Sequence, residues 1–172
     1  YMYLSNESVT VAGSVSVMDN YNELRLGHID LRTLTRENNK FTYDVTLPSD
    51  QFTNMDNVTS VTVEFNSEFW ASAAFRINEI TTVAEPAAYD VTLLTTSMNV
   101  VMVGEDSVIE TLSPADIVAE VNFLDKELVP GQYRYPVRIS APTKGLVWPV
   151  GDPNDLTVMV QVTERVSEEP VE

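Results

Sequence analysis

The stretch LTVMVQV, residues 156–162, carries an apolar side chain at every second position. Successive side chains of a β-strand point to opposite faces, so this alternation predicts a strand with one buried face. The β-branched and aromatic residues of similar stretches elsewhere in the chain favour the same interpretation. Strands are therefore predicted in FTYDVTL (41–47), SVTVEF (60–65) and YRYPVRI (133–139), and further at 8–12, 24–31, 73–80, 88–94, 98–104 and 117–123.

Helical patterns are short. In DSVIETL (106–112) three apolar residues fall on one helical face, which predicts about two turns. The stretch SPAD (113–116) has a capping residue followed by proline at the first helical position, and it predicts a single turn. Pro136 lies inside a strand pattern and has no N–H to donate, so we expect an edge strand or a bulge there. The fold class expected is all-β, with one or two short helices per repeat.

An internal repeat organises the chain. SVTVAG (8–13) aligns with NVVMVG (99–104), and Gly13 takes the place of Gly104. The apolar positions that follow align in the same order: 17–21 with 108–112, 29–31 with 121–123, 41–47 with 133–139 and, after a three-residue insertion, 61–63 with 156–158. Because few positions are identical, the order and spacing of apolar residues carry the alignment.

The repeat predicts two domains, residues 1–68 and 69–165, followed by an acidic tail at 166–172. The first domain is expected to be incomplete at its amino-terminal side, since only 12 residues precede Gly13. Either the chain starts inside a repeat or this repeat is a shorter variant. The opening YMYLSNES has no basic flank, no apolar run behind it and no initiator Met. We therefore expect any anchor of the parent protein to lie upstream of Tyr1.

Composition excludes several classes of function. The 172 residues carry 26 Asp and Glu against 10 Lys and Arg, a formal net charge of −16, which repels phosphate backbones and anionic lipids. Nucleic-acid binding is therefore not expected. The chain has no cysteine and only one histidine. It therefore lacks the residues that form zinc fingers, bind iron–sulfur clusters or act as thiolate catalysts. No apolar run is long enough to span a bilayer.

Candidate chemical residues are few, and each has a simpler structural interpretation. His28 falls where the strand alternation slips, which predicts a β-bulge with a surface histidine. The sequence GDPND (151–155) is ordinary turn chemistry rather than a calcium loop. Glu64, Glu68 and Glu79 are expected on solvated faces. We assign no catalytic, cofactor-binding or metal-ligating residue, and no cofactor is expected.

The two tryptophans are the aromatic candidates for ligand stacking. Trp148 is expected to pack on the core or at a sheet edge, and Trp70 to lie at the contact between the repeats. An acidic pair of the glycosidase type remains open from composition alone, because carboxylates are plentiful. Such a pair requires two carboxyl groups that face one another across a cleft.

The order of elements in the second copy resembles the YbbR repeat. The residues that carry the resemblance are NVVMVGEDSVIETL (99–112), DIVAEVNF (116–123), PGQYRYPVRISAP (130–142) and DLTVMVQV (155–162), with FRINEI (75–80) and YDVTLL (89–94) as opening strands. VTVAG (9–13) and GHIDL (27–31) match in the first copy, while its opening strands do not. The resemblance implies tandem, crossed-strand β modules similar to the C-terminal domain of L25-type ribosomal proteins.

What this resemblance implies about function is a non-catalytic, extracytoplasmic protein-interaction module of a bacterial membrane-tethered regulator. Members of the CdaR type regulate a membrane diadenylate cyclase, so the partner implied is such a cyclase and the process is cell-wall homeostasis. The family has no catalytic residues that could be carried over to this chain. The alternative is an adhesin-like or carbohydrate-binding β module of a cell-surface protein. The partner surface, the number of repeats in the parent protein and the oligomeric state stay open.

Overall fold

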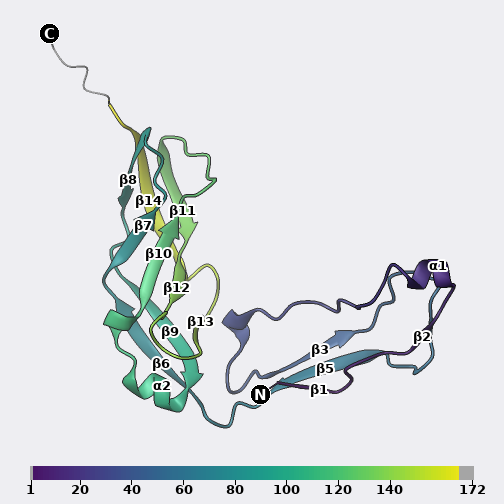
Figure 1. The fold of residues 1–172 in the computed structure, drawn as a ribbon. Coiled ribbons are helices and arrows are strands. Elements are labelled where there is room, and N and C mark those ends of the chain that lie inside the picture. Colours follow the sequence, from purple (N-terminus) through teal and green to yellow (C-terminus); the bar gives the residue numbers. More distant parts are fainter. Residues whose placement is uncertain (1, 167–172) are drawn as a thin grey trace. The chain divides into compact units, whose positions relative to one another are not determined.

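The computed structural model describes residues 2–166, which form two compact units (Figure 1). Unit 1 comprises the described residues up to Asp30 together with Leu34–Phe69. Unit 2 comprises Leu31–Thr33 and the described residues from Trp70 onward. Apart from the short segment Leu31–Thr33, the chain changes from unit 1 to unit 2 between Phe69 and Trp70. Strands dominate both units and the helices are short, so the predicted all-β fold class is confirmed.

Unit 2 holds most of the strands. Two short helical segments, α2 and η2, lie between β9 and β10. The 3-10 helix η1 also belongs to this unit, although it precedes the other elements in the sequence. The elements are η1 (Leu31–Thr33), β6 (Trp70–Ile77), β7 (Ile80–Val83), β8 (Tyr89–Leu93), β9 (Met98–Glu105), α2 (Asp106–Thr111), η2 (Pro114–Asp116), β10 (Val118–Asn122), β11 (Gly131–Pro136), β12 (Arg138–Ser140), β13 (Val147–Val150) and β14 (Thr157–Glu164).

These strands form three small sheets with the orders β13-β9-β6, β11-β14-β8 and β12-β10-β7. Every pair is antiparallel except β10 with β7, which is parallel. The alternate apolar side chains of β9, β10 and β14 point into one core, as the period of two predicts. The most deeply buried members of that core are Val100, Met102, Val121, Phe123, Val158, Val160 and Val162.

The strand pattern at 133–139 is split between two sheets. β11 pairs with β14 up to Pro136, and β12 then pairs with β10 from Arg138. At the crossing, the backbone N–H of Val137 donates to the carbonyl of Leu156 at 2.8 Å. Proline has no backbone N–H to donate to a strand ladder. The chain can therefore change sheet directly after Pro136 without losing a strand hydrogen bond at the proline. β11 is an edge strand, as the proline predicts.

Unit 1 has fewer and shorter elements. A three-stranded antiparallel sheet has the order β1-β5-β3, and β2 pairs with β4 in a separate two-stranded sheet (Figure 1). The bounds are β1 (Met2–Leu4), β2 (Val11–Ala12), α1 (Val15–Met18), β3 (Lys40–Asp44), β4 (Thr53–Asn54) and β5 (Ser60–Phe65). Its buried apolar side chains are Leu34, Phe52, Val61 and Val63.

The three-stranded sheet of unit 1 has the strand order and register of the β8-β14-β11 sheet of unit 2. Val63 of the central strand lies between Leu4 and Phe41. The central strand β14 places Val160 in the same way between Leu93 and Tyr133. The repeat alignment of the last strand is therefore wrong by two residues, since Val61 and Val63 correspond to Val158 and Val160.

The register also gives β1 the place of β8, so one opening strand of unit 1 is present after all. The sequence alignment missed it because β1 has only three residues in its ladder. Short edge strands give little periodicity to detect. Whether each unit is a YbbR-like repeat, as the predicted domains 1–68 and 69–165 require, stays a prediction. The tail at 166–172 lies outside the described residues except for Val166.

The two glycines that align the copies, Gly13 and Gly104, each lie close to the neighbouring strand segment of their own unit. A Cβ on Gly13 would lie 2.9 Å from the ring of Phe52, and one on Gly104 would lie 2.7 Å from the carbonyl oxygen of Leu146 and 3.1 Å from Cβ of Val147. By the strand pairings of β2 with β4 and β9 with β13, Phe52 and Val147 are equivalent positions. Glycine is needed at both sites because the neighbouring segment approaches the backbone there.

The predicted strand at 24–31 is wrong. Residues 23–30 form neither strand nor helix, although their counterpart in unit 2 is β10. β10 lies between β7 and β12, so its backbone groups are paired on both sides. No strand of the described part of unit 1 corresponds to β7, and residues 23–30 take part in no strand ladder. A one-face apolar pattern is therefore not sufficient for a strand.

Candidate interaction surfaces

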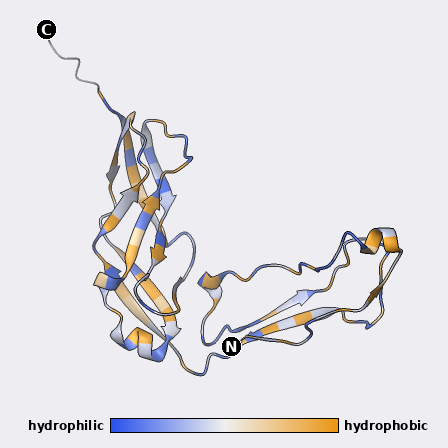
Figure 2. Ribbon diagram, in the orientation of Figure 1, coloured by the Kyte–Doolittle hydropathy of each residue, from blue (hydrophilic) through white to orange (hydrophobic). Residues whose placement is uncertain are grey.

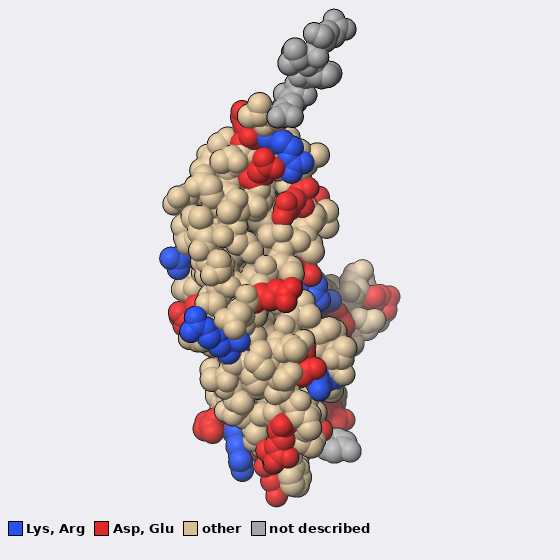
Figure 3. Space-filling view, turned by 90° about the vertical axis from the view of Figure 1, so that its left-hand side faces the viewer, with Lys and Arg blue, Asp and Glu red and all other residues tan. Residues whose placement is uncertain are grey.

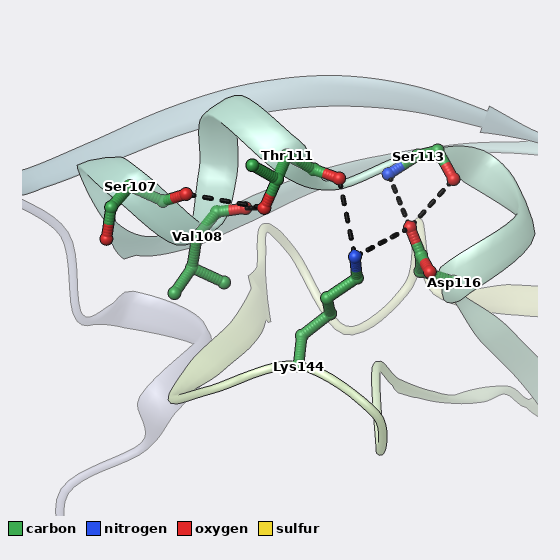
Figure 4. Close-up of polar contacts among 6 residues, drawn as sticks. All are labelled: Ser107, Val108, Thr111, Ser113, Asp116 and Lys144. Atoms are coloured by element: carbon green, nitrogen blue, oxygen red, sulfur yellow. Dashed lines mark hydrogen bonds and ion pairs between the residues drawn. The ribbon is translucent and has the colours of Figure 1, made fainter.

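The clearest polar network in unit 2 is structural. The carboxylate of Asp116 accepts hydrogen bonds from the backbone N–H of Ser113 at 2.9 Å and from its hydroxyl at 2.7 Å (Figure 4). Lys144 Nζ lies 3.4 Å from the same carboxylate oxygen and 3.4 Å from the Thr111 carbonyl (Figure 4). The network joins the end of α2, the turn η2 and the loop before β13. It confirms the predicted turn at 113–116.

These contacts lower the pKa of Asp116 from its ordinary value of 3.8, chiefly through the hydroxyl and then the backbone N–H of Ser113. A carboxyl whose pKa is lowered by folding stabilises the folded state fully at pH values above its unfolded pKa. This stabilisation is lost as the pH falls through the pKa of the folded state. We expect Asp116→Asn to lower the melting temperature of unit 2 at about pH 7, and we expect this effect to shrink as the pH falls below the ordinary pKa of 3.8. Scanning calorimetry over this pH range measures the difference in melting temperature between the variant and the wild type. A difference that does not change with pH would contradict the network.

A second lowered carboxyl lies in unit 1. Asp56 accepts a hydrogen bond from the backbone N–H of Thr10 at 2.6 Å, and its pKa is lowered first by the Thr10 hydroxyl and then by that N–H. A general acid of the glycosidase type needs the opposite shift, a raised pKa. Asp56 and Asp116 both hold local backbone in place, and neither has the electrostatics of an acid catalyst.

The predicted solvated acids occupy the expected kind of position. Glu64 in β5 is the cross-strand neighbour of Lys40 in β3 and pairs with its ammonium group at 2.8 Å, while Glu68 and Glu79 are exposed. On the face drawn in Figure 3, acidic side chains lie in separate groups among uncharged surface. Across residues 2–166, no group of three or more His, Asp or Glu side chains is arranged to hold a metal ion.

His28 is exposed, as predicted, but no strand surrounds it, so the predicted β-bulge is wrong. The hydroxyl of Tyr43 donates to the carbonyl oxygen of His28 at 2.8 Å. A Cβ at Gly27 would lie 2.6 Å from the Tyr43 ring. The glycine before His28 therefore lets the tyrosine ring lie against the chain, and the imidazole takes no part in this contact.

The GDPND stretch (151–155) forms a turn, as predicted. Asp152 accepts hydrogen bonds from the backbone and side-chain nitrogens of Asn154 at 2.8 and 2.9 Å. Asp155 N–H donates to the Asp152 carbonyl at 2.9 Å, and Gly151 has a φ of +138°. The Asp152 carboxylate is used by its own turn.

The two tryptophans pack against each other within unit 2. Trp70 in β6 and Trp148 in β13 have ring centroids 5.0 Å apart at an interplanar angle of 79°. The Trp148 side chain is 5% exposed, which confirms its predicted packing on the core. An edge-to-face pair with one buried ring offers no flat platform for a sugar. The pair therefore lends no support to the carbohydrate-binding alternative.

Exposed apolar side chains of unit 2 occur in the loop after β10 and on β11. The loop after this strand exposes Leu124 and Val129, which are 63% and 60% accessible, and Tyr133 is exposed on β11. Among the strands of residues 2–166, β11 pairs with β14 alone, so its other edge is not paired with any of them and can accept an added strand. We call these three side chains and the free edge of β11 the β11 edge surface.

Unit 1 has an apolar groove with a volume of about 440 Å³. Its walls come from the segment around β2, from α1 and from the irregular stretch at 23–30. We call it the unit 1 groove. Its apolar lining side chains are Val9, Val11, Met18, Tyr21, Leu24, Leu26, Leu47, Pro48, Phe52 and Val61, with Glu7 and Glu23 at the charged positions.

No helix among residues 2–166 has the length and apolar character needed to cross a bilayer.

No family model matches the sequence, and no curated protein matches it. Among solved structures, the chain is similar to the YbbR-like domain of the lmo2119 protein from Listeria monocytogenes. The sequences are 14% identical, the TM-score is 0.43, and the match covers 58% of this chain and 99% of that one. The chain is an all-β protein by its own sheets.

Proposed function

We propose that this chain is a non-catalytic protein-interaction module that binds its partner through the β11 edge surface. The observation that carries the proposal is that exposed apolar side chains and an unpaired strand edge occur together there. An open edge offers main-chain hydrogen bonds to an added strand, and apolar side chains beside it supply burial on association. Burial of one such side chain contributes about 1.5–3 kcal/mol.

The partner we propose is a membrane diadenylate cyclase, with the module on the extracytoplasmic face of a bacterial membrane as part of a tethered YbbR-type regulator. Support for this finer assignment comes from the sequence motifs at 99–112, 116–123 and 130–142. The polar groups described above are consistent with it, since Asp56 and Asp116 stabilise local backbone. A module of this kind acts by contact and needs no catalytic residue.

The test is a titration of residues 1–172 into a diadenylate cyclase reconstituted in vesicles, with cyclic di-AMP production as the readout. We expect the wild-type chain to change the rate of production. The double variant Leu124→Asp/Val129→Asp is expected to need a concentration about tenfold higher or more, equivalent to about 1.4 kcal/mol of binding free energy. Both side chains are exposed, so the fold should be unaffected.

Leu146→Asp is the matched control, because Leu146 lies in another loop of unit 2 and is 71% exposed. It should behave as the wild type does. Unchanged cyclic di-AMP production with the wild-type chain would contradict the cyclase as partner. A wild-type effect that both variants retain equally would instead contradict the β11 edge surface as the binding site.

A further inference from the structure

The unit 1 groove combines buried and accessible apolar side chains. Phe52 and Val61 of its lining are 8% and 5% accessible. Met18, at the end of α1, and Tyr21 also line the groove, and they are 37% and 47% accessible. The apolar residues of α1 are orange in Figure 2. The rings of Tyr21 and Phe52 pack edge to face with centroids 5.5 Å apart, so the accessible ring is held against a buried one.

The size and the polar groups of the groove suit a peptide. Its volume of about 440 Å³ lies within the range of about 300–1,000 Å³ that is usual for ligand sites. Asn6, Ser8 and Asn22 line it beside the apolar residues. Their amide and hydroxyl groups can pair with the main chain of a peptide, whereas a hydrocarbon chain cannot use them. Met18 adds a flexible side chain of the kind that adapts to different apolar partners.

The charged lining of the groove is acidic. Glu7 and Glu23 line it, and the described lining residues include no Lys or Arg. Arg25 Nε lies 3.2 Å from Glu23 Oε1, but the two side chains are 90% and 69% exposed. An ion pair this exposed contributes little to stability, so it does not prevent Glu23 from pairing with another cation. A cation that enters the groove therefore meets two carboxylates.

The whole of unit 1 has the same sign of charge. It contains ten Asp and Glu residues against three Lys and Arg residues. A field of this sign attracts and orients a cationic segment, and it repels an anionic lipid surface. The accessible ring of Tyr21 adds an aromatic surface, which also attracts cations.

We infer that the unit 1 groove binds a peptide segment of a partner protein that carries apolar side chains together with Lys or Arg. The apolar side chains are buried against the groove, and the cation pairs with Glu7 and Glu23. The groove lies in unit 1, whereas the β11 edge surface lies in unit 2. The inference therefore concerns a second surface and does not depend on the proposed function.

The test is a titration of the full chain with capped peptides, followed by backbone amide NMR signals. In each peptide, Leu, Ile or Phe alternates with a residue X, and the same set is made with X as Lys, as Gln and as Glu. We expect the signals of residues 9–11 and 21–26 to shift. The Lys set should bind about tenfold or more tighter than the Glu set, equivalent to about 1.4 kcal/mol, with the Gln set between them.

The double variant Glu7→Gln/Glu23→Gln should bind the Lys and Glu sets almost equally, since the carboxylates of the groove are gone. Glu37→Gln/Glu68→Gln is the matched control, because both residues are exposed, belong to unit 1 and are not among the lining residues of the groove. It removes the same charge from the unit and should retain the preference for the Lys set.

A preference for the Lys set that the control keeps and the groove variant loses is the supporting result. Equal binding of the Lys and Glu sets to the wild type, the same loss in both double variants, or no shift at residues 9–11 and 21–26 would overturn the inference. Loss of those signals on addition of phosphatidylcholine vesicles would assign the groove to lipid. Shifts that grow with protein concentration without peptide would assign it to a second copy, and either result would also overturn the inference.

Discussion

Phe123→Ala is expected to lower the free energy of unfolding of unit 2 by about 3–5 kcal/mol, the usual cost of removing a buried aromatic ring. Phe123 is 1% exposed and packs edge-on against Tyr135 at a centroid distance of 5.0 Å. It directly follows β10, and its backbone N–H donates to the Val83 carbonyl at 3.0 Å. The ring thus fills the core where β10 and β11 meet.

Urea unfolding monitored by tryptophan fluorescence measures this effect, because Trp70 and Trp148 both lie in unit 2. The neighbouring Leu124→Ala is the control. Its side chain is 63% exposed, and the expected change is within about 0.5 kcal/mol. Equal stabilities of the two variants would show that Phe123 is not in the core.

Gly104→Ala is expected to destabilise unit 2 by about 1–3 kcal/mol, the usual cost of an overpacked site. The new Cβ would lie 2.7 Å from the carbonyl oxygen of Leu146, and a backbone atom held in a strand connection cannot move aside cheaply. β9 and β13 must separate locally, and Trp148 of β13 should report the change in its fluorescence.

Gly13→Ala is the matched variant in unit 1. Its Cβ would meet ring atoms of Phe52 at 2.9 and 3.2 Å, and a side chain can rotate where a carbonyl cannot. We expect a smaller loss of stability, measured by hydrogen exchange at the backbone amides of unit 1 under increasing denaturant. A larger loss for Gly13→Ala than for Gly104→Ala would contradict the argument that the Phe52 ring can move aside where the Leu146 carbonyl cannot.

Much of unit 2 is predictable from sequence because its signals agree with each other. The strand at 98–104 and the two turns of helix at 106–112 appear as β9 and α2, within a residue of the expected bounds. Alternating apolar residues face one core there, so period and burial coincide. Pro136 predicted an edge strand, but the change of sheet at Val137 needed knowledge of two partner strands.

Unit 1 shows where sequence patterns are insufficient. Leu24, Leu26 and Ile29 predicted a strand, yet residues 23–30 form none, since strand formation depends on a neighbour that pairs with it. The sequence patterns did not predict the short strands β1, β4 and β13. Strands this short show too little alternation to be recognised, and their pairing with neighbouring strands alone defines them. The unit 1 groove is lined by apolar residues drawn from several stretches between Val9 and Val61, and no sequence motif marks it.

The most direct measurement of the repeated architecture is a set of backbone nuclear Overhauser effects across the two equivalent sheets. The account predicts contacts of Val63 with Leu4 and Phe41 in unit 1. It predicts the same pattern for Val160 with Leu93 and Tyr133 in unit 2. Observation of both sets would confirm one sheet built twice; contacts displaced by two residues in either unit, or a β1 that does not pair with β5, would contradict it.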